Sequence, residues 1–332
     1  MSRKAPGKSH REGLSQKKFH KMFPSDEAAE AWFVERRWPD GIHCPHCGST
    51  NVQTGAKHKT MPYRCREKEC AKRFSAKTGT VMEGSKLGFQ DWMIATYELS
   101  TNLKSVSSMK LSRDLEINQR SAWFMAHRLR AALAEDGDVF TGPVEADETY
   151  LGGKRKNMSL SKRKELKEAG AGRGPSDKEA VVGVKDRETG KVAVRHVQST
   201  DTANVAGFVA EKTQEGAKVY SDEAKVYNAL NALYDHEAVN HSVGEYVREM
   251  AHTNGMESFW AMIKRSYTGT FHKLSPKHLE RYIQEFASRH NLREQDTIDI
   301  MGAVFDGGIG KRLRYKELIA DNGLPSGARS GG

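Results

Sequence analysis

Four cysteines in one short window constrain the fold of this 332-residue chain more than any other feature of its sequence. Cys44 and Cys47 form a C-x2-C pair, and Cys65 and Cys70 form a C-x4-C pair after 17 intervening residues. Two tight turns that present four thiolates can close a tetrahedron around Zn²⁺ and leave no position open for a substrate. The spacing therefore predicts a zinc ribbon whose structural metal contributes to folding. Free buried thiols, or a mixed site that includes a nearby histidine, are the alternatives.

The charge of the chain favours a polyanionic partner. Its 53 Lys and Arg stand against 43 Asp and Glu, a formal net charge of +10. Basic side chains that neutralise phosphates release condensed counterions, although many basic proteins bind no nucleic acid. No apolar run approaches the roughly 20 residues that span a bilayer, and the N-terminus lacks the apolar core of a signal peptide. We therefore expect a cytoplasmic protein with no membrane partner.

The first 136 residues divide into three predicted parts. Residues 1–22 are basic and show no periodicity, so we expect a disordered basic arm. Residues 23–85 are expected to hold a short helix, capped by Ser25 or Asp26 and ended by Pro39, and then the zinc ribbon. Residues 86–136 follow a helical pattern with short polar breaks and are expected to form a DNA-binding region.

The helical region has the pattern of a helix-turn-helix. Its first helix would bury Met109, Leu111 and Leu115, and a turn falls near Ile117 and Asn118. The second helix would leave four polar side chains available for a DNA duplex: Gln119, Arg120, Arg128 and Arg130. Small three-helix bundles without affinity for DNA share this pattern, so the prediction depends on the neighbouring ribbon and basic arm.

Residues 137–295 are predicted to form an α/β domain. Three strand-like segments, two of them joined by the hairpin turn "RETG", precede alternating helices and strands. Residues 152–178 interrupt this pattern with a basic loop, from which we expect DNA contacts by Lys154, Arg155 and Lys156. A solvated insertion is the simpler alternative. Residues 296–332 are expected to be a C-terminal extension and disordered tail.

The segment "HTNGMESFWAMIKR", residues 252–265, predicts an amphipathic helix. Its apolar face holds Met256, Phe259, Trp260, Ile263 and Tyr267, which recur at the helical period. The opposite face holds Asn254, Glu257, Ala261 and Lys264. A solvated surface is the usual meaning of such a polar face.

Acidic residues at particular spacings suggest a more specific meaning. Asp147 and Asp222 each lie in a strand-like segment, and Glu257 follows Asp222 after 34 intervening residues. Lys264 lies two helical turns beyond Glu257 on the same face. Each acid taken alone is more often a surface residue. Two strand acids followed by a helix acid about 35 residues later is the pattern of RNase H-like, or retroviral-integrase-like, nucleases and transposases.

Three segments carry a resemblance to a known family. "VEADETYLGGK", "VYSDEAKVYNAL" and "HTNGMESFWAMIKRSYTGTFHKLSPKHLERYIQEF" follow the cysteine pairs and "FSAKTGTVMEGSKL". Together they resemble the insertion-sequence 1595 family of bacterial transposases, the ISXO-like group, over roughly residues 25–292. The resemblance implies an RNase H-like catalytic domain of DDE type behind a zinc ribbon and a helix-turn-helix.

The resemblance also implies cofactors, partners and residue roles. Asp147, Asp222 and Glu257 would hold two Mg²⁺ or Mn²⁺ ions for phosphodiester cleavage and strand transfer. Family members carry Glu or Asn at the third position. Asn254 is therefore an alternative or additional metal ligand to Glu257. Lys264 and Arg265 would contact DNA. The partners would be double-stranded element ends and target DNA, with a homo-oligomer in the synaptic complex of a bacterial, nucleoid-associated protein.

Two other functions remain compatible with the sequence. One is an RNase H-like DNA nuclease or resolvase without strand transfer. The other is a zinc-ribbon DNA-binding regulator with an inactive nuclease domain. The three intact acids argue against the regulator, because a regulator has no need of convergent carboxylates.

Overall fold

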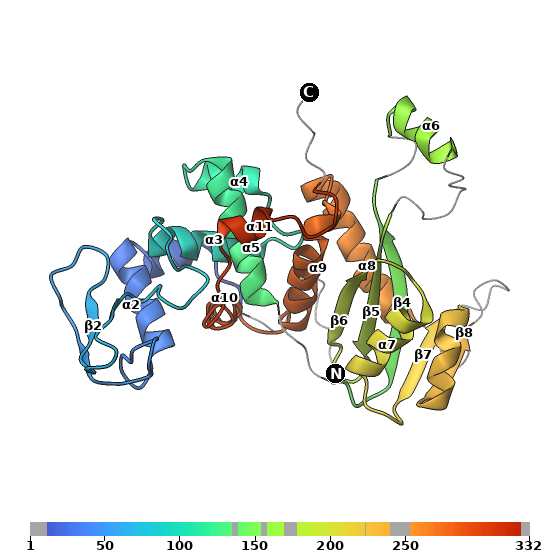
Figure 1. Ribbon diagram of the computed structural model, residues 1–332, viewed down its shortest axis with the longest axis horizontal. Coiled ribbons are helices and arrows are strands. Elements are labelled where there is room, and N and C mark those ends of the chain that lie inside the picture. Colours follow the sequence, from blue (N-terminus) through green and yellow to red (C-terminus); the bar gives the residue numbers. More distant parts are fainter. Residues whose placement is uncertain are drawn as a thin grey trace. The chain divides into compact units, whose positions relative to one another are not determined.

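The computed structural model describes most of the chain, namely residues 12–134, 139–153, 158–168, 178–222, 224–239 and 253–326. The chain divides into two compact units (Figure 1). Unit 1 comprises Met1–Glu135 with Leu292–Ala320, and unit 2 comprises Asp136–Asn291 with Asp321–Gly332. Within the described ranges, no helix has both the length and the apolar character needed to cross a membrane.

Unit 1 begins with two helices, α1 (Gln16–Met22) and α2 (Asp26–Arg37). Helix α2 confirms the predicted N-cap, since the Ser25 hydroxyl accepts a hydrogen bond from the backbone N–H of Ala28 at 3.3 Å. Helix α1 contradicts the prediction of a disordered arm for residues 16–22. The arm prediction missed Phe19, which is buried against Phe23 and Tyr97 and so anchors the helix to the core.

A small sheet follows, formed by β1 (Val52–Gln53), β2 (Tyr63–Cys65) and β3 (Arg73–Phe74) in antiparallel order. One face carries Tyr63 and the buried Phe74, which pack with Trp38 at the end of α2. These rings attach the sheet to the helical part of unit 1.

Three helices occupy the region predicted to be helical: α3 (Phe89–Thr101), α4 (Ser108–Asp114) and α5 (Gln119–Leu133). The turn between α4 and α5 falls where expected, because Asn118 caps α5 by accepting from the backbone N–H of Ser121 at 2.8 Å. Leu111 and Leu115 are buried as predicted, whereas Met109 is exposed.

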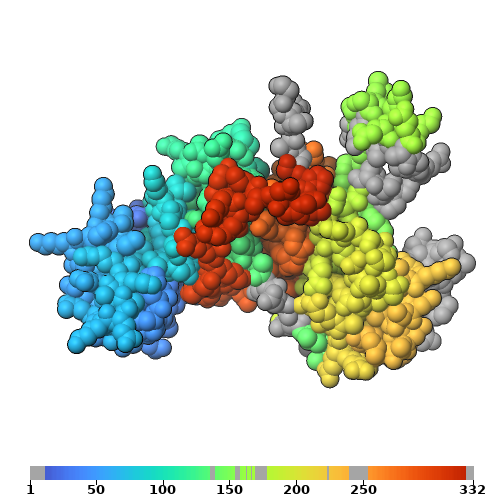
Figure 2. Space-filling view, in the orientation of Figure 1, coloured from blue at the N-terminus to red at the C-terminus, as the bar shows by residue number. Residues whose placement is uncertain are grey.

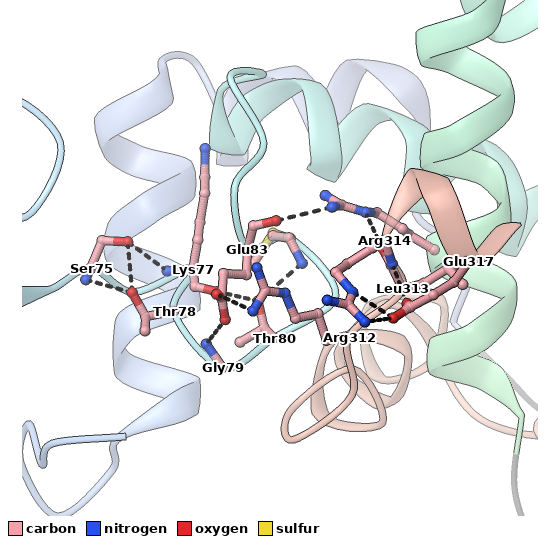
Figure 3. Close-up of polar contacts among 12 residues, drawn as sticks. Ser75, Lys77, Thr78, Gly79, Thr80, Glu83, Arg312, Leu313, Arg314 and Glu317 are labelled. Carbon is pink, nitrogen blue, oxygen red and sulfur yellow. Dashed lines mark hydrogen bonds and ion pairs between the residues drawn. The ribbon is translucent and has the colours of Figure 1, made fainter. Parts of the chain in front are cut away.

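The C-terminal segment completes unit 1 rather than forming a separate extension. Helix α10 (Thr297–Asp306) places Met301, Val304 and Phe305 in the same core as α2, α3 and α5. Figure 3 shows the segment before α11 (Tyr315–Ile319) beside the loop that follows the ribbon. There Arg312 forms an ion pair with Glu83 at 3.1 Å.

Unit 2 is built on a five-stranded mixed sheet in the order β6-β5-β4-β7-β8. The strands are β4 (Val144–Leu151), β5 (Glu179–Asp186), β6 (Val192–Val197), β7 (Lys218–Asp222) and β8 (Asp235–Val239). Strands β4, β5 and β6 pair antiparallel, and the β5–β6 connection is the predicted hairpin. Strand β7 runs parallel to both β4 and β8. In this strand order, β4 is the central strand.

Helices cover both faces of this sheet (Figure 1). One face packs against α7 (Thr202–Lys212) and the 3-10 helix η2 (Lys225–Ala232). The other packs against α8 (Asn254–Ser266) and α9 (Pro276–Asn291), with the short π-helix η4 (Tyr267–Phe271) between them. Successive residues of β4 alternate between these two faces. Within the predicted basic loop, residues 160–168 form helix α6 (Leu160–Glu168).

Candidate functional site

The four cysteines of unit 1 converge as their spacing predicts. Their sulfur atoms all lie within 4.8 Å of one another, with Cys44 and Cys70 3.8 Å apart and Cys47 and Cys65 3.6 Å apart. A tetrahedral zinc ion with Zn–S bonds of about 2.3 Å separates its sulfurs by about 3.8 Å. No two of these cysteines are joined in a disulfide. The geometry fits a structural zinc ion with a closed coordination shell.

In unit 2, the sheet brings two of the predicted acids together. Parallel pairing sets Val144 beside Val219 and Glu145 beside Tyr220. Continuing this register by two residues places Asp147 beside Asp222, with both side chains on the face that α8 covers. The strand predictions for both acids are confirmed, and their convergence follows from the pairing of β4 with β7.

A third acid, Glu148, completes the cluster. Carboxylate oxygens of Asp147, Glu148 and Asp222 all lie within 4.8 Å of one another. The buried Tyr227 of η2 donates a hydrogen bond to Glu148 at 2.6 Å and so fixes this carboxylate. Glu148 was not predicted from the sequence, because strand alternation assigns it to the opposite face from Asp147. One sequence feature could have indicated Glu148. It directly follows Asp147 on β4, and the neighbouring strand β7 ends at Asp222.

Holding these three carboxylates together in their ionised form costs free energy when no cation is bound. Burial, together with the charges of Glu148 and Asp222, raises the pKa of Asp147 to about 7. Burial also raises the pKa of Glu148, although the Tyr227 hydrogen bond opposes this. Carboxylate oxygens are the ligands that Mg²⁺ and Mn²⁺ prefer. The donor set therefore fits a divalent cation, whose charge would offset the repulsion.

Helix α8 docks against the cluster through its apolar face. Met256, Phe259, Trp260 and Ile263 are buried, which confirms the predicted face apart from the half-buried Tyr267. The indole N–H of Trp260 donates to Asp147 Oδ2 at 3.1 Å. The helical pattern predicted Trp260 only as a packing residue and did not predict this contact.

A buried carboxylate on β4 holds the start of α8. Glu145 Oε2 accepts a hydrogen bond from the backbone N–H of Met256 at 3.0 Å, and Glu145 Oε1 pairs with Arg187 at 2.9 Å. A carboxylate is stabilised at a helix N-terminus by the unpaired N–H groups there. This contact sets the start of α8 against the strand that carries Asp147.

The polar face of α8 carries the remaining predicted site residues. Asn254, Glu257, Lys264 and Arg265 are all exposed. Glu257 lies three residues before Trp260 and therefore beside it on the helix surface. Among described residues, the acidic cluster contains Glu148 and not Glu257. The role of Glu257 or Asn254 as third ligand remains a prediction.

The predicted DNA contacts of α5 separate into two groups. Gln119 and Arg120 are exposed in the first turn of the helix. Arg128 and Arg130 are buried, contrary to the prediction that they face a duplex. Arg128 donates to the backbone carbonyls of Leu313 at 3.1 Å and Glu83 at 3.0 Å. The C-terminal segment encloses this half of α5, which helical periodicity alone did not indicate.

Basic residues elsewhere add to the exposed positive charge. Arg64 of β2 and Arg73 of β3 are direct partners across the ribbon sheet, and both are exposed. Like charges directly opposite on neighbouring strands destabilise a sheet. In the described part of the chain, neither guanidinium has an acidic partner. Figure 2 shows the ribbon in light blue at the surface. The predicted contacts Lys154, Arg155 and Lys156 lie outside the described residues.

Comparisons with known proteins identify both modules. A family model for a transposase zinc-ribbon domain matches residues 24–73, and one for an ISXO2-like transposase domain matches residues 139–291. Both matched segments are therefore similar to modules of insertion-sequence 1595 family transposases.

A curated relative extends this similarity. The chain is 28% identical over 282 residues to a protein from Halobacterium salinarum described as "Uncharacterized protein in transposable element ISH50". The match covers 82% of this chain and 93% of that protein. No solved structure matches the chain.

Proposed function

We propose that this protein is a DDE-type DNA transposase that cleaves the ends of its insertion sequence and joins them to target DNA. The observation that carries the proposal is the convergence of Asp147 and Asp222 on neighbouring strands of an ISXO2-like transposase domain. The mixed sheet, with β4 at its centre and helices on both faces, supports an RNase H-like assignment for unit 2. The proposal assigns Glu257 as the third catalytic acid.

The chemistry requires convergent carboxylates. Divalent cations, when bound, would supply activation of the attacking water or 3′-hydroxyl and stabilisation of the leaving oxygen. Asp147 and Asp222 would hold these cations from the sheet, and Glu257 from α8. Glu148, fixed by Tyr227, adds negative charge at the same place. Lys264 and Arg265, exposed on α8, would contact the phosphates of the bound strand.

Recognition of DNA is assigned mainly to unit 1. The exposed first turn of α5 presents Gln119 and Arg120, and in a helix-turn-helix this end of the second helix contacts base edges. Arg64 and Arg73 on the ribbon sheet would contact phosphates, which removes the repulsion between them. The basic segment with Lys154, Arg155 and Lys156 is proposed as a further contact. Pairing of two element ends would require a homo-oligomer.

The third ligand can be tested by substitution on α8. Glu257→Gln keeps the size of the side chain but removes its charge, so cleavage should fall by orders of magnitude. Asn254→Ala should cost less, because it removes at most an amide ligand. Lys264→Ala should weaken binding of DNA and reduce its salt dependence. Cleavage and joining of DNA that carries the element's ends are measured in Mg²⁺ and Mn²⁺, with Asp147→Asn as the inactive reference.

The outcomes separate the proposed function from its alternatives. Full activity of Glu257→Gln beside an inactive Asn254→Ala would make Asn254 the third ligand. Cleavage without joining would identify a nuclease or resolvase. Binding of the ends without any metal-dependent cleavage would identify a regulator.

A further inference from the structure

We propose that Trp260 is a positioning residue of the acidic cluster. Its indole N–H holds the Asp147 carboxylate in the orientation that binds a divalent cation, and it ties α8 to that ligand. The proposal rests on the proposed function, because it takes Asp147 as a cation ligand. It adds a residue outside the set of acids, and a role that differs from packing.

The hydrogen bonds of Asp147 define its orientation. Oδ1 accepts from the backbone N–H of Glu148 at 2.9 Å, and Oδ2 accepts from Trp260 Nε1 at 3.1 Å. With both oxygens bonded, the carboxylate plane cannot rotate freely. Each carboxylate oxygen offers two lone-pair sites, so each keeps one for a cation. The arrangement is therefore compatible with a cation between Asp147 and Asp222.

The neighbouring strand leaves room for the indole. Gly183 of β5 is the direct partner of Asp147 across the sheet. A Cβ atom on Gly183 would lie 2.7 Å from two ring carbons of Trp260, closer than real contacts allow. A glycine in the middle of a strand weakens the strand. Here its missing side chain lets the ring lie beside Asp147.

Packing alone does not account for a tryptophan at this position. Trp260 is 3% exposed, and its buried N–H needs an acceptor. That acceptor is the Asp147 carboxylate of the acidic cluster, at 3.1 Å. A phenylalanine would satisfy the apolar face of α8 without an N–H group.

The same contact fixes the distance between the sheet and the polar face of α8. The helix is held at its start by Glu145, through Met256, and one turn later by Asp147, through Trp260. Glu257 lies between these two attachment points. The position of a third ligand on α8 relative to Asp147 therefore depends on both hydrogen bonds.

The test measures cation binding rather than activity. The zinc-loaded full chain is titrated with Mn²⁺, and free Mn²⁺ is followed by electron paramagnetic resonance. Trp260→Phe keeps a ring on the apolar face and removes the N–H. We expect its Mn²⁺ dissociation constant to rise on the order of 10-fold, as for residues that orient metal ligands. Ile263→Val, which trims the same buried face without touching Asp147, should lower the melting temperature and leave this constant unchanged.

The controls separate failure of this inference from failure of the proposed site. Mn²⁺ binding by the unsubstituted chain that Asp222→Asn abolishes establishes the site. With the site established, an unchanged constant in Trp260→Phe, or an equal rise in Ile263→Val, overturns the role of Trp260. If the unsubstituted chain binds no Mn²⁺ that depends on Asp222, the proposed site itself is overturned, and the inference with it.

Discussion

The ribbon sheet of unit 1 and the five-stranded sheet of unit 2 both place like charges on neighbouring strands. Arg64 and Arg73 are exposed, so solvent and salt screen their repulsion. Asp147 and Asp222 lie near a buried tryptophan, and burial raises the pKa of Asp147 to about 7. On the proposed function, this difference in exposure determines which ligand each pair binds. The exposed pair suits a long, screened polyanion, and the enclosed acids suit a small divalent cation.

The largest expected effect is a loss of cleavage, assigned to unit 2, without a loss of DNA binding, assigned mainly to unit 1. Asp222→Asn should reduce cleavage by several orders of magnitude, because it removes a proposed cation ligand. Binding of end DNA should persist, since recognition of DNA is proposed mainly for unit 1 and Asp222 is not among the proposed DNA contacts. Cleavage assays and gel-shift titrations on the same preparation measure both properties. Loss of DNA binding together with cleavage would show that the two functions do not divide between the regions.

The next effect concerns the zinc site. Cys65→Ser removes one of four ligands, so the ribbon should unfold and end binding should fall by at least 10-fold. Unit 2 has its own cores and should stay folded. Zinc content, circular dichroism and limited proteolysis report these changes. A matched Ser49→Ala variant, altered beside the ligands, should retain zinc.

The pH dependence of stability sharpens the account of the acids. Without divalent cations, folded Asp147 has a pKa of about 7, above its ordinary value of 3.8. Its contribution to the free energy of unfolding is therefore fully present below about pH 4 and is lost as pH rises towards 7. We expect a loss on the order of 2–4 kcal/mol in unit 2, measured by urea unfolding.

Two comparisons isolate Asp147 as the cause of this loss. Asp147→Asn should flatten the pH dependence, and Mn²⁺ should restore stability more at pH 8 than at pH 5. The free energy of unfolding of the Asp147→Asn variant is subtracted from that of the unsubstituted chain at each pH. A difference that rises between pH 4 and 7 would contradict the raised pKa of Asp147.

The smallest effect concerns the arginine pair. Replacing both Arg64 and Arg73 by Gln should reduce the slope of log affinity against log salt by about 2, since each phosphate contact contributes about 0.9. The loss should be similar for end DNA and random DNA, because phosphate contacts carry no sequence information. Lys17→Gln with Lys21→Gln on α1 removes the same charge elsewhere in unit 1. An equal change of slope in this control would show that the effect comes from net charge and not from the position of Arg64 and Arg73.

Local patterns predicted most elements of the fold. The cysteine spacing predicted the ribbon, Ser25 predicted the start of α2, and short strand-like segments predicted β4, β5 and β6. Contacts between distant segments were not predictable in the same way. Burial of Arg128 depends on Leu313, 185 residues away in sequence, and the core position of Phe305 depends on α2. Helical periodicity describes one face of a helix, and it does not report that another segment covers the opposite face.

The candidate site shows the same division. Spacing identified Asp147 and Asp222, because strand acids at these positions meet when the strands pair. Glu148 was missed because alternation places it on the other face, where Tyr227 holds it. Trp260 was taken as core, because the sequence cannot show that its N–H meets a carboxylate. These two residues acquire their roles only through tertiary contacts.

Anomalous diffraction from crystals of the protein grown with Mn²⁺ tests the central claim most directly. We predict a manganese peak about 2.1 Å from carboxylate oxygens of both Asp147 and Asp222, with Trp260 still bonded to Asp147. The same map would show whether Glu257, Asn254 or Glu148 completes the coordination. A fully loaded crystal with manganese elsewhere and none between Asp147 and Asp222 would contradict the assignment of this cluster as the catalytic centre.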